Sequence, residues 1–276
     1  MPVILTTGGK LMILRRLSEN LRAQNWTAIS IEFLIVVIGV FIGTQVSNWN
    51  QDRIEQRETE RLLVNLAPEL QGQMNFINDV RKYYAVTRKF ADQALAGWRG
   101  DKNISDNQLV IAAYQASQIT GIGTNAENWT LTFGGEQLRN IEDPRVRRNL
   151  EVVLTADYSP ITLNSAASPY REHVRRVIPI AVQDAIRRAC GDRVAINARM
   201  GYVHISLPET CPLKLPPDQA AKVAASLRAR PELAEELNWH LATIAVTLLN
   251  VDLLEPPIRE LHRALTADPS KRGNAS

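Results

Sequence analysis

The chain has 276 residues, of which 45% are hydrophobic and 22% are charged, and its formal net charge is +3. This is the composition of an ordinary globular protein, which excludes wholesale disorder and a multi-pass membrane protein but leaves room for one membrane span. The small positive charge gives little support to a nucleic-acid partner, and none is predicted. Two cysteines, Cys190 and Cys211, are too few for a disulfide-dense scaffold or a four-cysteine zinc site.

The first predicted element is a transmembrane helix over residues 26–49. Between Trp26 and Trp49 the chain is mostly Ile, Val, Leu, Phe and Gly. At about 1.5 Å per helical residue the segment is roughly 35 Å long, which matches the ~30 Å hydrocarbon core with its interfacial margins. The two tryptophans suit the aromatic belts of a membrane. Basic residues outnumber acidic ones in residues 1–25, so the positive-inside rule predicts a cytoplasmic N-terminal segment.

Two alternatives to an uncleaved signal anchor remain open. The uncharged run from Phe33 to Gly43 is shorter than a usual span, so a buried helix of a soluble core is one alternative. A cleaved signal peptide is the other, but Gly43-Thr44-Gln45 is a poor cleavage site. Met12 begins a second possible start of the chain, and no prediction depends on residues 1–11.

A polar and glycine-containing face is predicted on this helix. At 100° per residue, Glu32, Gly39, Gly43 and Asn50 fall within about 20° of one another. Glycines four residues apart allow a second helix to approach closely, and a carboxylate on the same face would point toward that partner rather than lipid. We therefore expect a parallel homodimer through this face. The alternative is that Glu32 reaches the cytoplasmic headgroups.

Two segments resemble a family of bacterial single-pass membrane proteins that has no assigned activity. The first is IEFLIVVIGVFIGTQVSNWN, residues 31–50, with a glutamate, an apolar run, a glutamine and a Trp-Asn pair. The second, from Asn128 to Tyr158, is NWTLTFGGEQLRNIEDPRVRRNLEVVLTADY. Gly43, where the family has alanine, and the long N-terminus depart from the pattern. The resemblance implies one membrane span and a helical exterior domain, but no activity.

The first half of the exterior part is predicted to be helical. Apolar residues at steps of three and four over residues 52–98 indicate one long helix or two, with a kink or break at Pro68 and Gly72. A second helix is predicted over 106–116, and residues 121–128 form a loop. Asp143-Pro144 is typical of a helix start, and this helix is expected to reach Tyr158.

Further helices are expected after residue 168. Ser168-Pro169 begins a helix to Cys190, with an internal kink at Pro179. Another helix starts at Pro216-Pro217, and the next at Pro231. Leu241 to Leu254 is apolar nearly all round and is predicted to be the central helix of the bundle, with a second membrane span as the alternative. Pro256-Pro257 should interrupt this helix before it resumes at Ile258.

Alternation of apolar residues over residues 193–207 predicts one β-hairpin. Cys190 and Cys211 flank its two strands, so a disulfide across the base of the hairpin is expected. Such a bond needs an oxidising compartment, in agreement with a periplasmic domain over residues 50–267. The alternative is two free buried thiols in a cytoplasmic protein. Residues 268–276 are predicted to be a disordered tail.

No catalytic, metal or cofactor motif is evident. The four histidines do not have ligand spacing, so we predict that the protein is not an enzyme and has no cofactor or metal. Arginines are frequent between residues 145 and 193, where they suit an anionic ligand or lipid headgroup, although solvated helix faces often carry such runs. The candidate anion-binding residues are Arg145, Arg148, Arg171 and Arg175.

The sequence thus predicts a mainly α protein, with an N-terminal transmembrane helix followed by a helical bundle and one small β-hairpin. The predicted function is an interaction or scaffold subunit of the inner membrane, bound to the lipid bilayer and associating with itself or another envelope protein. The alternative is a periplasmic ligand-sensing domain that acts through a separate membrane partner, and its small-molecule ligand is left open.

Overall fold

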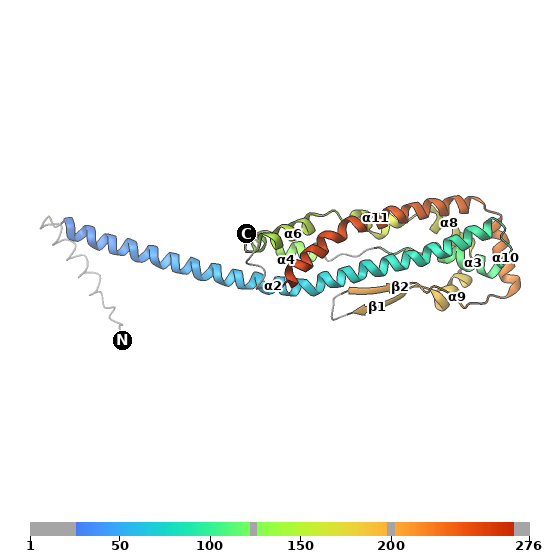
Figure 1. The fold of residues 1–276 in the computed structure, drawn as a ribbon, viewed down its shortest axis with the longest axis horizontal. Helices are drawn as coiled ribbons and strands as arrows, with labels where there is room; N and C mark the ends of the chain where they lie inside the picture. The colour runs from blue at the N-terminus through green and yellow to red at the C-terminus, as the bar shows by residue number, and fades with distance from the viewer. Residues whose placement is uncertain (1–25, 122–125, 198–201, 268–276) are drawn as a thin grey trace, which may run out of the picture. The chain divides into compact units, whose positions relative to one another are not determined.

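A computed structural model describes residues 26–121, 126–197 and 202–267 (Figure 1). The described chain is mainly α, with a long N-terminal helix, a helical region and one two-stranded antiparallel hairpin, so the predicted fold class is confirmed. The chain divides into two compact units between Glu58 and Thr59. The predicted cytoplasmic segment 1–25 and the predicted tail 268–276 lie outside the described residues.

Helix α2 extends from Trp26 to Trp98 without interruption and contains Pro68. Of the two predicted alternatives, one long helix is therefore confirmed, and the helix does not break at Pro68. A proline has no N–H to donate to the carbonyl four residues earlier, which here belongs to Val64. Val64 and Pro68 are both exposed, so water can bond the freed carbonyl and the helix continues.

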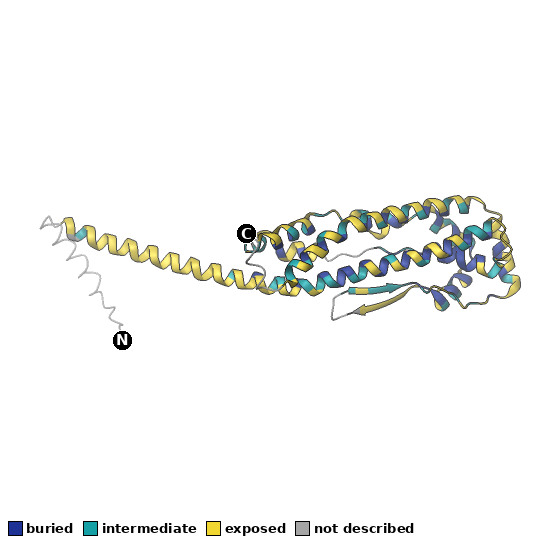
Figure 2. Ribbon diagram, viewed as in Figure 1, coloured by how far each residue is buried: buried dark blue, intermediate teal, exposed yellow. Residues whose placement is uncertain are grey.

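Within the second unit, α2 contributes one buried face to the core (Figure 2). The apolar spacing predicted this face, and its side chains are almost completely buried. Helix α3, Asp106–Gln115, begins with a capping box between Ser105 and Gln108 and is buried along most of its length. A buried, non-helical segment follows from Ala116 to Thr120. The buried positions of α2 include Leu66, Leu70, Met74, Ile77, Val80, Tyr84 and Ala91.

Two short helices follow, α4 at Ala126–Phe133 and α5 at Glu136–Arg139. The predicted loop 121–128 is therefore too long, because its last three residues are helical. Gly134 and Gly135 separate the two helices. Gly135 has φ of 76°, in the left-handed region that glycine adopts without a Cβ penalty.

Helix α6 covers Pro144–Thr155 and begins as predicted, with Asp143 Oδ1 accepting a hydrogen bond from the Arg145 N–H. It ends before Tyr158, because Ala156 is extended and the 3₁₀ turn η1, Ser159–Ile161, follows. The short helix α7, Leu163–Ala166, completes this connection.

The predicted helix from Ser168 to Cys190 is two helices, α8 at Pro169–Val177 and α9 at Ile180–Cys190. Pro179 therefore separates two helices instead of kinking one. The residue before a proline is disfavoured in the α region, and Ile178 is extended with ψ of 120°. Ile178 is buried, so packing holds this extended backbone in place.

The hairpin is confirmed, with β1 at Arg193–Asn197 and β2 at Tyr202–Ser206. Val194 pairs with Ile205 and Ile196 with Val203. The structure also pairs Cys190 with Cys211 as a disulfide, with their Cα atoms 5.2 Å apart. The turn between the strands lies outside the described residues.

The last two helices are α10, Pro217–Arg228, and α11, Glu232–Thr266. Helix α11 passes through Pro256 and Pro257, so the predicted interruption is wrong. The carbonyls that lose a donor belong to Asp252 and Leu253, which are both exposed to solvent. Helix α11 packs against α6 and α8, while α10 packs against α3 (Figure 1).

Candidate functional site

The apolar segment at the start of α2 is uncovered on all sides. Its large hydrophobic side chains between Phe33 and Val46 are 45% to 70% exposed, and Trp26 and Trp49 are exposed as well. Two described helices are long and apolar enough to cross a membrane, α2 and α11. In α2 none of the apolar window is buried, whereas 28% of the window in α11 is. The start of α2 is therefore not the core helix of the described bundle.

The residues of the predicted transmembrane interface all lie on α2. They are exposed, and a Cβ added at Gly39 or Gly43 would meet nothing within 4 Å. Their spacing along one continuous helix places Glu32 and Asn50 on the same face as the two glycines. The face is thus open to a close approach by a second helix.

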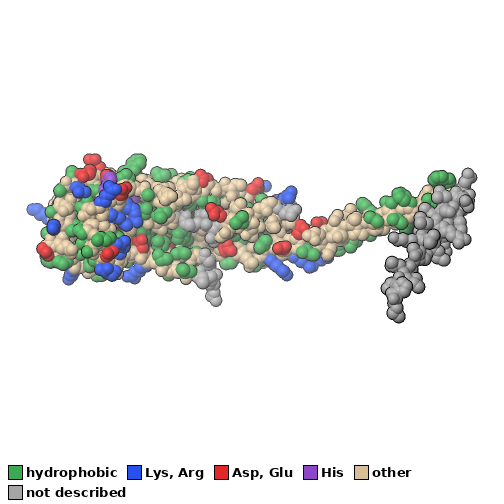
Figure 3. Space-filling view, turned by 180° about the vertical axis from the view of Figure 1, so that it is seen from behind, with side chains coloured by type: hydrophobic (Ala, Val, Ile, Leu, Met, Phe, Trp, Pro, Cys, Tyr) green, Lys and Arg blue, Asp and Glu red, His purple; other side chains and the backbone are tan. Residues whose placement is uncertain are grey.

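The four candidate anion-binding arginines fall into two places. Arg145 and Arg148 lie on α6, whereas Arg171 and Arg175 lie on α8. Lysine and arginine side chains are frequent at one end of the helical region in Figure 3. The structure therefore does not gather all four into one site.

Arg171 and Arg175 hold the buried segment that follows α3. Arg171 Nη1 donates a hydrogen bond of 2.6 Å to the Ser117 carbonyl, and Arg175 Nε donates one of 3.0 Å to Ser117 Oγ. Arg175 Nη2 donates a bond of 2.8 Å to Gln118 Oε1, and its guanidinium lies 4.8 Å from the centre of the Tyr114 ring. These contacts satisfy backbone and side-chain acceptors of a loop inside the core.

Asp192 partly balances the positive charge of Arg171 and Arg175. Burial lowers the pKa of Arg175, and the nearby Arg171 lowers it further. Asp192 faces both arginines and accepts a hydrogen bond of 2.9 Å from Tyr83. Burial nevertheless raises the pKa of Asp192, against the effects of Tyr83 and the arginines. In the described chain, these side chains form a structural cluster between helices α2, α3 and α8.

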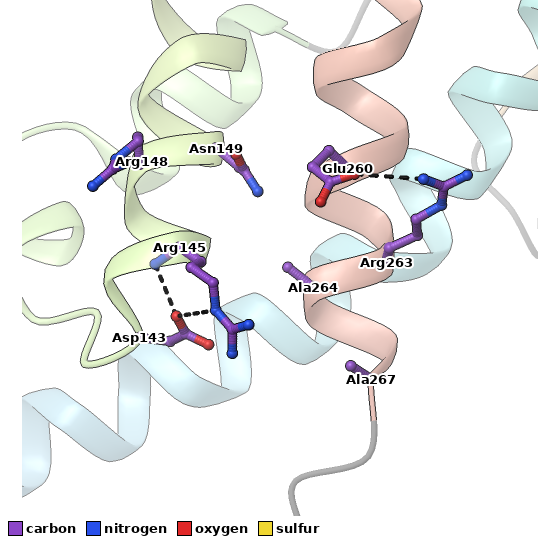
Figure 4. A pocket seen from close by; sticks show the side chains of 8 residues that line it. All are labelled: Asp143, Arg145, Arg148, Asn149, Glu260, Arg263, Ala264 and Ala267. Carbon is purple, nitrogen blue, oxygen red and sulfur yellow. Dashed lines mark hydrogen bonds and ion pairs between the residues drawn. The ribbon is translucent and has the colours of Figure 1, made fainter. Parts of the chain in front are cut away.

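Arg145 and Arg148 line a pocket of about 420 Å³ between α6 and α11 (Figure 4). Figure 4 shows Asn149 and Glu260 directed into the space between the helices, while Arg148 and Arg263 are directed away from it. Arg145 Nε lies 3.7 Å from Asp143 Oδ1, and Arg263 Nη1 lies 3.5 Å from Glu260 Oε2. The pocket is thus lined by side chains of both charges.

A second pocket of about 420 Å³ lies between α2 and β2. His204 Nδ1 and Asp79 Oδ2 are 2.5 Å apart on its wall, and Lys89 Nζ lies 3.5 Å from Glu209 Oε2. Across the residues that the structure describes, no group of three or more His, Cys, Asp or Glu side chains could hold a metal ion.

One outward face of α11 is apolar and was missed in the sequence. It carries Trp239, Val246, Leu249 and Leu253, which are 65%, 58%, 58% and 67% exposed. Ala242 and Pro256 are exposed as well and complete the row. We name these six residues the α11 stripe. The whole segment 241–254 is apolar, which concealed the distinction between the buried face and this exposed face.

The hairpin also exposes apolar side chains. Val194, Ile196 and Val203 lie on one face of the two strands, as their register requires, and all three are exposed. Ile205 belongs to the same face and packs in part against the core.

Comparisons of the chain with protein-family models, curated proteins and solved structures found no match in any of the three. The resemblance to the bacterial single-pass family therefore stays a prediction.

Proposed function

We propose that the protein is a bitopic inner-membrane protein that serves as a non-enzymatic interaction or scaffold subunit. Residues 26–49 span the membrane, residues 1–25 lie in the cytoplasm and the helical unit lies in the periplasm. The observation that carries the proposal is the apolar start of α2, whose side chains are exposed on every side. Water would solvate such a surface poorly, and a bilayer would cover it.

The disulfide supports the proposed orientation. Cys190 and Cys211 lie at bonding distance, and such bonds persist in oxidising compartments such as the periplasm. The excess of basic residues before the span points to the same orientation.

Association of copies is supported by the open face of the anchor. Gly39 and Gly43 leave room for a second helix, and Glu32 on the same face would gain a polar partner in place of lipid. A parallel homodimer through this face, or a contact with another envelope protein, would give the two glycines a closely packed helix and Glu32 a polar partner.

The first experiment tests membrane topology. A reporter enzyme that is active only after export, fused after residue 276, should be active in cells, and Cys190 and Cys211 should resist thiol labelling until a reductant is added. Val40→Arg, which places a charge in the middle of the span, should release the chain from the membrane fraction. A reporter active only in the cytosol, or freely labelled thiols, would refute the proposed orientation.

The second experiment tests association. Crosslinking in native membranes should capture copies of the chain or one recurring partner, and Gly39→Ile with Gly43→Ile should reduce the product, because the larger side chains prevent close helix approach. Recovery of scattered abundant proteins alone would refute a scaffold role.

A ligand-sensing domain that acts through a separate membrane partner is the second candidate. It is favoured by the pocket between α6 and α11, where Arg145 and Asn149 offer hydrogen-bond donors. Thermal unfolding of the full chain with millimolar citrate or phosphate tests it: a rise in melting temperature that Arg145→Ala removes would support sensing, whereas no rise would refute it for these anions.

A further inference from the structure

The α11 stripe has the spacing of a coiled-coil seam. Its six residues follow one another at steps of three, four, three, four and three. Residues at such alternating steps occupy positions a and d of a heptad repeat and form one narrow row along a helix. On α11 this row faces away from the core, whose own row includes Leu237, Ile244 and Val251. The helix therefore has two apolar faces, of which the described chain covers one.

The row is suited to another helix rather than to a lipid surface. An acidic residue, Glu235, lies on the same face one turn before Trp239, whereas Glu260, one turn after Pro256, is directed toward α6 (Figure 4). Helices that lie on anionic membranes flank their apolar face with lysine and arginine, and an acid at the end of this row would be repelled there. From Trp239 to Pro256 the row has no charge, so a second apolar row can meet it without burying an unpaired ion.

The size of the row restricts the identity of the partner. Trp239 and Pro256 are 17 residues apart, so the row is roughly 26 Å long at about 1.5 Å per residue, and a strip about 10 Å wide covers roughly 260 Å². Stable complexes bury about 800 Å² on each partner. The row alone is therefore too small to capture a freely diffusing protein. A partner that is already held close, at a high effective concentration, needs far less contact area.

A second copy of the chain meets both requirements. Two copies associated through Gly39 and Gly43 of their anchors would hold their α11 helices at high effective concentration. The seam is also compatible with itself, because Val246 at position a and Leu249 at position d are the combination that favours two-stranded pairing. We propose that the α11 stripe pairs with the α11 stripe of a second copy of this chain that is anchored in the same membrane.

This proposal rests on the proposed assembly function and names its second contact. In an interface between two identical chains, residues near the two-fold axis meet their own counterparts. Val246→Cys and Leu249→Cys, placed singly at the middle of the stripe in the full-length chain, should therefore form disulfide-linked dimers in native membranes under mild oxidation. Ala225→Cys, on the exposed side of α10, is the matched control and should form no disulfide-linked dimer.

A second set of variants separates the contact from the anchor. Leu249→Glu with Leu253→Glu should lower the dimer yield of a membrane-permeable lysine crosslinker by about tenfold, because two apolar side chains leave the seam and like charges face each other. Leu131→Glu, at an exposed leucine of α4, is the control and should leave the yield unchanged. All these positions are exposed, and unchanged circular dichroism melting curves would exclude misfolding.

The outcomes are distinguishable. Dimers that persist in Leu249→Glu with Leu253→Glu but vanish in Gly39→Ile with Gly43→Ile would overturn the α11 contact and leave the proposed function standing. A wild-type chain that is monomeric and has no recurring partner in native membranes would overturn both. Leu249→Cys that never crosslinks, yet is shielded from water-soluble maleimide by the bilayer, would assign the stripe to lipid and overturn the proposal.

Discussion

His240 should make the stability of the bundle depend on pH. The side chain lies on α11, is completely buried, and places Nδ1 2.7 Å from Ser168 Oγ. Its ring centre lies 5.7 Å from that of Tyr170. Burial and, to a lesser extent, the charge of Arg171 lower the pKa of His240 to about 4, although a hydrogen bond with the Ala116 backbone acts in the opposite direction. The imidazole is therefore neutral in the folded protein near neutral pH.

The direction of the effect follows from proton binding. An exposed histidine in the unfolded chain has a pKa of about 6.5, so between that pH and about 4 the unfolded state binds more protons than the folded state. The free energy of unfolding consequently falls as the pH is lowered through this window. One pKa unit corresponds to about 1.4 kcal/mol, so the loss is about 2 kcal/mol at pH 5 and about 3 kcal/mol below pH 4.

Urea unfolding of the full chain in detergent, followed by circular dichroism between pH 7.5 and pH 5, measures this loss. His240→Gln removes the titrating group, so the stability difference between wild type and variant should change by about 2 kcal/mol across the range. His173→Gln is the control, because that histidine is partly exposed beside Glu236 and should leave the His240 contribution in place. An equal dependence on pH in wild type and His240→Gln would refute the reasoning.

Three further predictions concern packing and cross-links. Glu255 is buried and ion-paired, so Glu255→Gln should destabilise the chain by about 2 kcal/mol in urea, whereas the exposed Asp252→Asn should cost less than about 0.5 kcal/mol. Hydrogen bonds from its arginines outweigh burial and lower the pKa of Glu255, so this contribution should be lost on acidification through the folded-state pKa. Replacing Cys190 and Cys211 by serine should lower the unfolding free energy by about 3 kcal/mol, the entropy of closing a 21-residue loop. Tyr84→Phe removes two hydrogen bonds to a buried backbone, so it should lower the free energy of unfolding by about 2 kcal/mol and lower the melting temperature with it.

Local signals in the sequence were sufficient to predict several elements of the fold. The helix start at Asp143-Pro144 follows from a side-chain cap and a preset φ angle, which depend on adjacent residues only. The hairpin follows from alternating side chains, and the pairing of Cys190 with Cys211 follows from their positions at its base.

The prolines were harder to predict because their effect depends on tertiary surroundings. Pro68 and Pro256 leave carbonyls that water reaches, and both helices continue through them. Pro179 follows a buried, extended Ile178, and there the helix ends. All three have the same local chemistry, and only packing around the chain separates them.

The candidate sites show the same division. The exposed face of the anchor could be derived from a single helical period. The arginines could not be assigned in this way, because Arg171 and Arg175 turn toward a buried loop that belongs to a different part of the chain. The α11 stripe was hidden for a related reason, since composition alone does not reveal which side of an apolar helix the bundle covers.

The two adjacent prolines of α11 have a consequence for local opening. They remove the amide protons of two successive positions, so the hydrogen-bond ladder is interrupted where the helix bears Glu255. Glu255 accepts hydrogen bonds from Arg259, one turn further on, and from Arg81 of α2. These bonds hold the helix segments on the two sides of the prolines in place. Deuterium uptake should therefore show α11 as two cooperative segments, with the part after Pro257 exchanging earlier and opening without disturbing the part that precedes it.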